Sequence, residues 1–257
     1  MTARARPNGL IGAIQFLTRV PLRSSAAADP AATIAWFPVV GALIGTVVGL
    51  VAAGAMHVVA PTVAASLAVL TGVALTGAFH EDGLADTCDA MGGWTTARRR
   101  EILLDSRLGT YGVAALAGSI LVRVASVATL GPAAALAAPV AAHAVGRGAA
   151  VAVMASAAHR RSARPDGLGA DHIHSLSGRR AAAAGVATVA IGAVAIGWWL
   201  VPATVAVALG AAVVVVVARR ALEGINGDVL GAVEQVGECL VLVVVSGLAS
   251  RSGVWWA

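Results

Sequence analysis

Long apolar runs separated by short polar or charged segments dominate the chain. Seven runs have the length needed to cross a bilayer, at about 34–57, 61–79, 112–130, 133–156, 181–201, 203–218 and 229–249. A shorter stretch from Leu10 to Val20 contains Gln15 and Arg19, so we expect an interfacial or re-entrant helix there. The pattern predicts an all-α fold, a polytopic membrane helix bundle of about six to seven transmembrane helices after an N-terminal interfacial helix.

The connections between the runs are of two kinds. Three are short, uncharged turns, at 59–61, 131–132 and 201–202. Three others carry arginines and most of the acids, at about 80–111, 157–180 and 219–228. The positive-inside rule places the charged group in the cytosol, together with Arg4, Arg6 and Arg23, and places Trp255 and Trp256 at the opposite interface. We therefore expect one integral membrane domain, 1–257, whose catalytic loops face the cytosol.

Composition agrees with a membrane protein. Hydrophobic residues make up 58% of the chain and charged residues 12%, and the mean hydropathy is +0.85, which leaves too little polar surface for a soluble globule. All eighteen basic residues are arginines, and no basic and aromatic residues interleave as in single-strand-binding proteins. Cys88 and Cys239 form neither a disulfide framework nor a zinc spacing. We expect no nucleic acid partner.

Carboxylates are concentrated in one segment. Six of the thirteen acidic residues fall between positions 81 and 105. If the segment is helical, Asp82, Asp86 and Asp89 share one face at i, i+4 and i+7, whereas Glu81 faces away from Asp82 and Asp86. Three such carboxylates repel one another unless a cation lies among them, and oxygen ligands favour Mg²⁺ first and Mn²⁺ second. His80 is a candidate general base, phosphate donor or hydrogen-bond orienter.

Two glycine-containing segments each allow two interpretations. In the segment 105–112, Gly109 and Gly112 with Ser and Thr could bring backbone N–H groups close to an anion, or could form a turn into the next span. In the segment 224–231, Asp228 could cap the last helix. A cap does not explain Glu234 and Glu238, which continue into the apolar run, where acids indicate function.

Two arginines are expected at membrane depth. Arg123 lies about ten residues into one run and Arg147 about ten residues from the cytoplasmic end of the next, which places both roughly 15 Å below the same interface. The turn at 131–132 predicts that these helices are antiparallel neighbours, with both guanidiniums in one polar cavity and His143 one turn from Arg147. A structural salt bridge to Glu234 and a phosphate-binding cavity both remain open.

Together the motifs resemble the cobalamin synthase family, the adenosylcobinamide-GDP ribazoletransferases. The resemblance rests on His80-x-Asp82-Gly83-Leu84-Ala85-Asp86-x-x-Asp89, Asp105-Ser106-Arg107-x-Gly109-x-x-Gly112 and Gly227-Asp228-x-x-Gly231-Ala232. It extends over almost the whole chain through the segments 16–21, 37–41 and 143–147. Ala90 stands where a glycine is usual, and Ile225 and Asn226 replace the more typical Gly and Thr. These departures lie outside the presumed ligands.

The resemblance implies a late step of cobalamin biosynthesis in the bacterial cytoplasmic (inner) membrane. A hydroxyl of alpha-ribazole or its 5′-phosphate attacks the phosphate attached to cobinamide in adenosylcobinamide-GDP and expels GMP. Such phosphoryl transfer depends on positioning and charge neutralisation, which Mg²⁺ supplies, with Mn²⁺ as a possible substitute. The substrates are small molecules, the lipid bilayer is the surroundings, and an oligomer is possible.

The resemblance also implies roles for individual residues. The expected metal ligands are Asp82, Asp86 and Asp89, with Asp105 and Asp228 as additional ligands. The expected substrate-binding residues are Asp105, Ser106, Arg107, Arg123, Arg147 and Asn226. The expected catalytic residues are His80, Asp82, Asp86 and Asp89, where His80 or an acid that holds no metal takes the hydroxyl proton.

Two rival functions are weighed against this one. A CDP-alcohol phosphotransferase also carries an Asp-Gly acidic motif in a membrane bundle, but its Ala-Arg is absent, since Asp86 follows Ala85. A cation transporter should spread its acids along several spans to both faces of the membrane, whereas the acids here are expected on one side.

Overall fold

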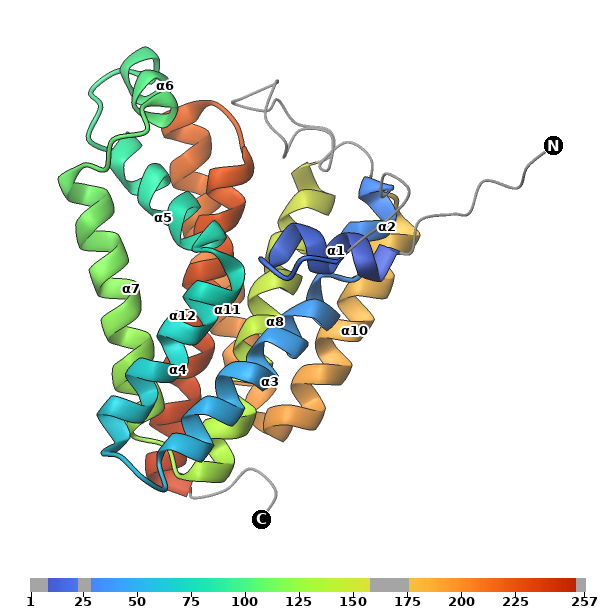
Figure 1. Cartoon of the computed structure of the whole chain (residues 1–257). Coiled ribbons are helices and arrows are strands. Elements are labelled where there is room, and N and C mark those ends of the chain that lie inside the picture. Colours follow the sequence, from blue (N-terminus) through green and yellow to red (C-terminus); the bar gives the residue numbers. More distant parts are fainter. Residues whose placement is uncertain (1–8, 23–28, 158–175, 253–257) are drawn as a thin grey trace.

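The computed structural model describes residues 9–22, 29–157 and 176–252, and these residues form helices and no strands. The elements in chain order are α1 (Gly9–Leu17), α2 (Pro30–Ile34), α3 (Phe37–Ala55), α4 (Pro61–Thr76), α5 (Phe79–Ala90), α6 (Thr96–Leu104), α7 (Thr110–Ala128), α8 (Pro132–Ala157), α10 (Gly178–Ile196), the 3₁₀ turn η1 (Gly197–Trp199), α11 (Leu200–Leu222) and α12 (Gly227–Ser252). Figure 1 shows the long helices side by side in one bundle. The predicted fold class is confirmed.

Several of these helices are suited to crossing a membrane. Among the described residues, five helical stretches are long and apolar enough, and a sixth results if the bent pair α4 and α5 counts as one span. One of the five, Gly178–Leu222, is 45 residues long. Gly197, with a φ of 53°, interrupts it, and in Figure 1 α10 descends and α11 rises again. The chain is a multi-pass membrane protein.

Glycines determine how closely α3 and α8 pack. Gly41, Gly45 and Gly49 recur every four residues on one side of α3. A Cβ atom on any of them would lie 2.2–2.3 Å from a backbone carbonyl oxygen of α8. Small residues at this spacing let two backbones approach each other, which is how many membrane helices associate. This contact fixes α8, and with it Arg147, beside α3.

The chain bends by 90° between α4 and α5. Gly77 and Ala78, at the bend, have φ values of 67° and 58°, which is a conformation that costs energy for a residue with a side chain. The ring of Phe16 in α1 packs edge-to-face on Phe79, with centroids 5.2 Å apart. Because of the bend, α5 packs against α12 within the bundle. The predicted polar segment 80–111 therefore contains two helices, α5 and α6.

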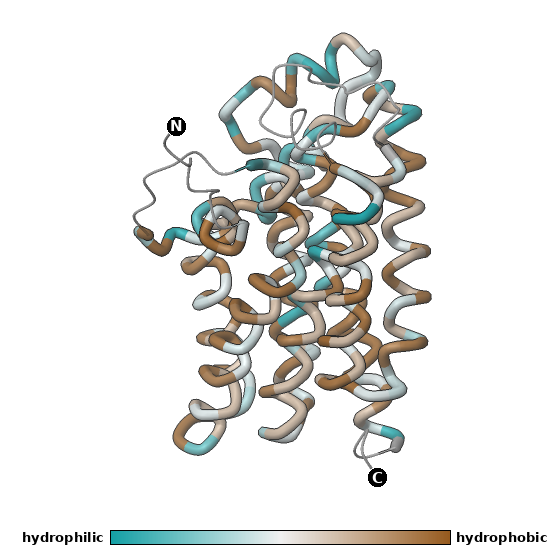
Figure 2. The backbone as a smooth tube through the Cα atoms, turned by 90° about the vertical axis from the view of Figure 1, so that its right-hand side faces the viewer, coloured by the Kyte–Doolittle hydropathy of each residue, from teal (hydrophilic) through white to brown (hydrophobic). Residues whose placement is uncertain are grey.

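The charged connections gather at one end of the bundle. Figure 1 shows α6 and the turn between α11 and α12 at the same end, and the turns after α3, α7 and α10 at the other. Hydrophilic residues are likewise concentrated at the first end in Figure 2. The predictions for Arg4, Arg6, Arg23, Trp255 and Trp256 lie outside the described residues, as does the segment 158–175.

One predicted neighbourhood is wrong. The turn at 131–132 was expected to make α7 and α8 close neighbours, but the two helices make few contacts with each other, and each packs against α12. A short turn fixes only where the next helix begins, and α12 has the side chains that both helices contact. Arg123 and Arg147 therefore meet across α12.

Candidate functional site

The two acidic motifs meet where α5 crosses α12. A Cβ atom on Gly83 would lie 2.9 Å from the carbonyl oxygen of Asp228 and 3.2 Å from the Cα of Gly231. A Cβ atom on Gly231 would lie 3.3 Å from the Cα of Gly83. Glycine at both positions thus allows the two backbones to touch. The contact places Asp228 beside the helix that carries Asp82 and Asp86, although about 140 residues separate the motifs.

The predicted helix for Asp82, Asp86 and Asp89 is confirmed as α5. The three acids differ in environment, because Asp82 is exposed, Asp86 is partly buried and Asp89 is buried. α5 rises from the bend after α4 toward α6 at the charged end (Figure 1), and Asp89, near the end of the helix, contacts the start of α7.

Asn226, rather than Asp228, caps α12. The Oδ1 atom of Asn226 accepts a hydrogen bond from the backbone N–H of Val229 at 3.0 Å. Its Nδ2 atom donates to Oδ2 of Asp228 at 2.7 Å. The capping interpretation for Asp228 is therefore wrong, and Asn226 orients the Asp228 carboxylate instead. Asn226 itself is buried, and its role as a substrate-binding residue stays a prediction.

Asp89 holds the N-terminus of α7. Its Oδ2 atom accepts from the backbone N–H of Gly109 at 2.7 Å, and its Oδ1 atom from that of Gly112 at 2.8 Å. A Cβ atom on either glycine would lie within 2.4 Å of this carboxylate. The glycine segment thus binds an anion through its backbone, as one interpretation expected, and that anion is Asp89.

Asp105 and Arg107 pair with each other at the charged end. The Nη2 atom of Arg107 donates to Oδ2 of Asp105 at 2.6 Å, and its Nε atom to Oδ1 at 3.0 Å. These hydrogen bonds lower the pKa of Asp105 to about 2. The Arg107 side chain is 86% exposed and Ser106 is exposed. Both residues lie at the surface, where they can meet a substrate.

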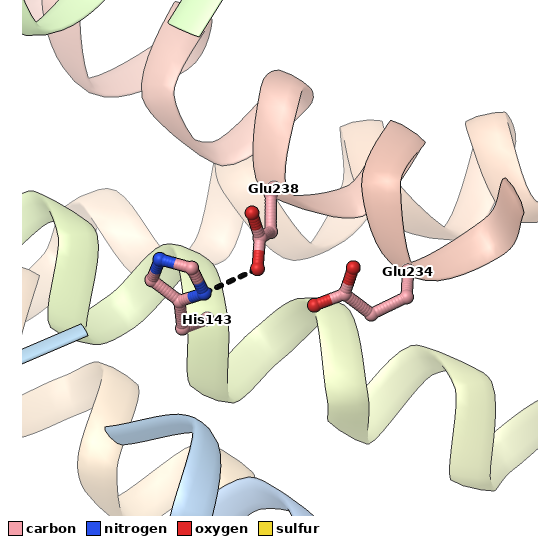
Figure 3. A group of neighbouring side chains, drawn as sticks. All are labelled: His143, Glu234 and Glu238. Carbon is pink, nitrogen blue, oxygen red and sulfur yellow. Dashed lines mark ion pairs between the residues drawn. The ribbon is translucent and has the colours of Figure 1, made fainter. Parts of the chain in front are cut away.

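A second group of acids lies deep in the bundle. Among the described residues, one set of three His, Cys, Asp or Glu side chains brings its ligand atoms within 4.8 Å of one another, namely His143, Glu234 and Glu238. Figure 3 shows the two glutamates on α12 turned toward His143 on α8. Nη1 of Arg147 lies 2.5 Å from Glu234 and 2.9 Å from Glu238. A guanidinium thus already supplies the positive charge, so this trio does not fit a metal site.

The buried arginines face carboxylates of the protein itself. Arg147 is 1% exposed and pairs with Glu234, as the salt-bridge interpretation expected. Arg123 is 4% exposed and contacts Glu81 at 3.1 Å and Glu238 at 3.2 Å. The two arginines share Glu238, which agrees with their predicted common depth. The phosphate-cavity interpretation of Arg123 and Arg147 stays a prediction, and this geometry weighs against it.

His80 points to the same interior. It is buried, and its Nδ1 atom lies 3.6 Å from Oε2 of Glu234 and 3.5 Å from Nη2 of Arg147. Of the roles considered for His80, the hydrogen-bond orienter agrees best with this position. Its role as a general base stays a prediction.

The sequence interpretation assigned no role to Glu81, which is buried and paired with Arg123. That Glu81 faces away from Asp82 and Asp86 was expected. A signal for its role was present, because two arginines at membrane depth need carboxylate partners at the same depth.

Comparison with known proteins decides the family. A family model described as cobalamin-5-phosphate synthase matches residues 9–246. The chain belongs to the cobalamin-5-phosphate synthase family. The predicted resemblance is confirmed, and the chain is an enzyme of cobalamin biosynthesis.

Curated relatives support the family assignment over nearly the whole length. A protein of Azorhizobium caulinodans named adenosylcobinamide-GDP ribazoletransferase is 38% identical over 251 residues, which cover 90% of this chain and 92% of the relative. Proteins with the same name from Bradyrhizobium diazoefficiens and Klebsiella pneumoniae are 40% and 39% identical, each over 90% of this chain and over 90% and 96% of their own lengths. No solved structure matches this chain.

This cobalamin-5-phosphate synthase fold offers two groups of acids to a metal ion. Asp82, Asp86 and Asp228, here called the outer acids, fit Mg²⁺ better than the buried trio of His143, Glu234 and Glu238 does. Asp82, Asp86 and Asp228 supply oxygen donors, which Mg²⁺ prefers, at a helix crossing near the charged end. The buried trio includes a histidine, and Arg147 lies between its carboxylates. We therefore assign the candidate active site to the crossing of α5 and α12.

Proposed function

We propose that this enzyme joins adenosylcobinamide-GDP to alpha-ribazole or its 5′-phosphate and releases GMP. Relatives that cover nine tenths of the chain carry the name adenosylcobinamide-GDP ribazoletransferase. The observation that carries the proposal is the contact of Gly83 with Asp228 and Gly231, because it brings both acidic motifs of the family to one place. Neither of the two rival functions, CDP-alcohol phosphotransferase and cation transporter, explains why the chain matches this family.

We infer that Asp82, Asp86 and Asp228 hold a Mg²⁺ ion, which Mn²⁺ can replace. When bound, the ion neutralises negative charge on the phosphates of the substrate. Asp89, also expected as a ligand, accepts from two backbone N–H groups, and Asp105, likewise expected, pairs with Arg107. We propose supporting roles for these two acids.

The reaction breaks the phosphoanhydride linkage between the cobinamide phosphate and GMP and forms a phosphodiester. The ribazole hydroxyl oxygen bonds to the phosphorus attached to cobinamide, and the bond from that phosphorus to the oxygen of GMP breaks. The hydroxyl proton passes to an acid that holds no metal, because His80 faces inward toward Glu234. Arg107 is exposed in the turn before α7 and is suited to bind substrate phosphate oxygens.

We propose that the charged end of the bundle faces the cytosol of a bacterial inner membrane, as the positive-inside rule indicates. Cys88 on α5 provides the test. A membrane-impermeant thiol reagent should label Cys88 of a Cys239→Ala variant in inside-out vesicles, and not in right-side-out ones. The opposite pattern would invert the topology.

The activity is tested with purified protein in lipid vesicles, adenosylcobinamide-GDP, alpha-ribazole 5′-phosphate and Mg²⁺. We expect release of GMP and formation of the joined corrinoid product, and loss of both on chelation with EDTA. The matched control is Asp86→Asn in the same vesicles. Folded wild-type protein that releases no GMP contradicts the proposal.

A further inference from the structure

A closed series of buried contacts begins and ends on α5. Glu81 of α5 contacts Arg123 of α7 at 3.1 Å, and Arg123 contacts Glu238 of α12 at 3.2 Å. Glu238 contacts Arg147 of α8 at 2.9 Å, and Arg147 contacts Glu234 of α12 at 2.5 Å. The series returns to α5 at His80, 3.6 Å from Glu234. We call these six residues the ion ring.

The ion ring resists displacement. Each member is at most 7% exposed, and charges of opposite sign alternate from Glu81 to Glu234. A buried charge that loses its partner is strongly unfavourable. Because Glu81 and His80 are adjacent on one helix, any rotation of α5 about its axis disturbs both ends of the ring at once.

α5 needs such a restraint. It has only twelve residues and follows a 90° bend. The glycine contact with α12 sets how closely the helices approach, but Gly83 and Gly231 have no side chains that interlock. Asp89 ties the last turn of α5 to the N-terminus of α7, and the ion ring restrains the first turn of α5 against rotation.

We propose that Glu81, through the ion ring, is a positioning residue for Asp82 and Asp86. Glu81 directly precedes Asp82, so a rotation of α5 that releases Glu81 also turns Asp82 and Asp86 relative to Asp228. This inference rests on the proposed function, because it takes the reactive site to lie at the outer acids Asp82, Asp86 and Asp228. The ring makes no contact with substrate in this account and acts only by fixing the orientation of α5.

Cys88 of α5 reports the orientation of the helix without any substrate or metal. It is partly buried, so loosening α5 should expose its thiol. In a Cys239→Ala background, Glu81→Gln removes the charge but keeps the shape, and Arg123 retains Glu238. We expect Cys88 alkylation to accelerate roughly tenfold, as for local opening after loss of a charged hydrogen bond, and kcat to fall more than KM changes.

The matched control is Ile44→Ala, which leaves a cavity in the core on α3, a helix that contributes no member of the ring. It should lower the Tm while the Cys88 rate and turnover stay within about twofold of wild type. Arg123→Lys is the second ring variant, because one ammonium cannot reach Glu81 and Glu238 with the geometry of a guanidinium. Like Glu81→Gln, it should accelerate alkylation of Cys88 and lower kcat.

The outcomes separate this inference from the proposed function. Unchanged Cys88 rates and unchanged kcat in folded Glu81→Gln and Arg123→Lys would overturn the positioning role. The positioning role is also overturned if Ile44→Ala accelerates alkylation of Cys88 as much as the ring variants do. Absence of GMP release by wild type contradicts the proposed function, whereas the Cys88 rates still decide whether the ring fixes α5.

Discussion

The two sides of α5 carry the same carboxylate chemistry in opposite environments. Glu81 is 4% exposed and pairs with a buried arginine. The next residue, Asp82, is exposed, and Asp86 one turn later is partly buried. We infer from this comparison that the partner of an acid, and not its residue type or its place in a motif, decides its role. The inner acids are neutralised by arginines of the bundle, and the outer acids lie where a cation and phosphates can reach them.

The largest expected effect is on the outer side. Asp86→Asn should lower turnover by about 100-fold or more, because it removes charge from the site that neutralises the phosphates. The Tm should stay close to that of wild type, since the amide has the same shape. GMP release and thermal unfolding in detergent measure both. Near-normal turnover would place the site elsewhere than on the outer side of α5.

On the inner side the expected effect is on stability. Glu238 contacts both Arg123 and Arg147, so Glu238→Gln should lower the free energy of unfolding by about 3–5 kcal/mol. Glu101→Gln, in an exposed pair with Arg98, is the matched control and should change the Tm little. Thermal unfolding in detergent is the measurement. Equal Tm values for the two variants would show that the buried pairs do not support the bundle.

Asp89 belongs to the outer face in sequence but is used as a structural acceptor. Asp89→Asn should cost about 1–3 kcal/mol, because its amide nitrogen cannot accept from a backbone N–H of α7. The Mg²⁺ concentration for half-maximal activity should change less than in Asp82→Asn. The opposite result, intact stability with a large rise in that concentration, would make Asp89 a metal ligand.

The smallest effect concerns the surface pair at the charged end. The Arg107 hydrogen bonds lower the pKa of Asp105 to about 2, below its unfolded value of about 4. A lowered folded pKa gives stability that is present above the unfolded value and is lost as pH falls through the folded one. Arg107→Ala should therefore lower the Tm slightly at pH 7 and less at pH 2, where about half of the Asp105 carboxyl groups are protonated. An equal difference at both pH values would contradict this pairing.

The sequence predicted the elements better than their contacts. The apolar runs correspond to the long helices because run length and bilayer thickness are related directly. The spacing of Asp82, Asp86 and Asp89 predicted one helix because helical periodicity is local. The 90° bend at Gly77 and Ala78 had no such signal, since an alanine takes a positive φ only when tertiary contacts such as that of Phe16 with Phe79 favour it.

Within the site, local motifs were predicted and their partners were not. Asn226 and Asp228 are both good capping residues, so their order at the start of α12 could not decide which one caps the helix. The partner of Glu81 is 42 residues away, and the contact of Gly83 with Asp228 depends on how α5 packs on α12. Such long-range contacts follow from packing rather than from local spacing.

The central claim is that the metal binds at the outer acids and not at His143, Glu234 and Glu238. Electron spin-echo measurements on the Mn²⁺-loaded enzyme test it directly, because a bound histidine nitrogen modulates the Mn²⁺ signal. We predict no ¹⁴N coupling from a coordinated imidazole, and loss of bound Mn²⁺ in Asp86→Asn but not in His143→Gln. A ¹⁴N coupling that disappears in His143→Gln would place the metal in the buried trio and contradict the assignment.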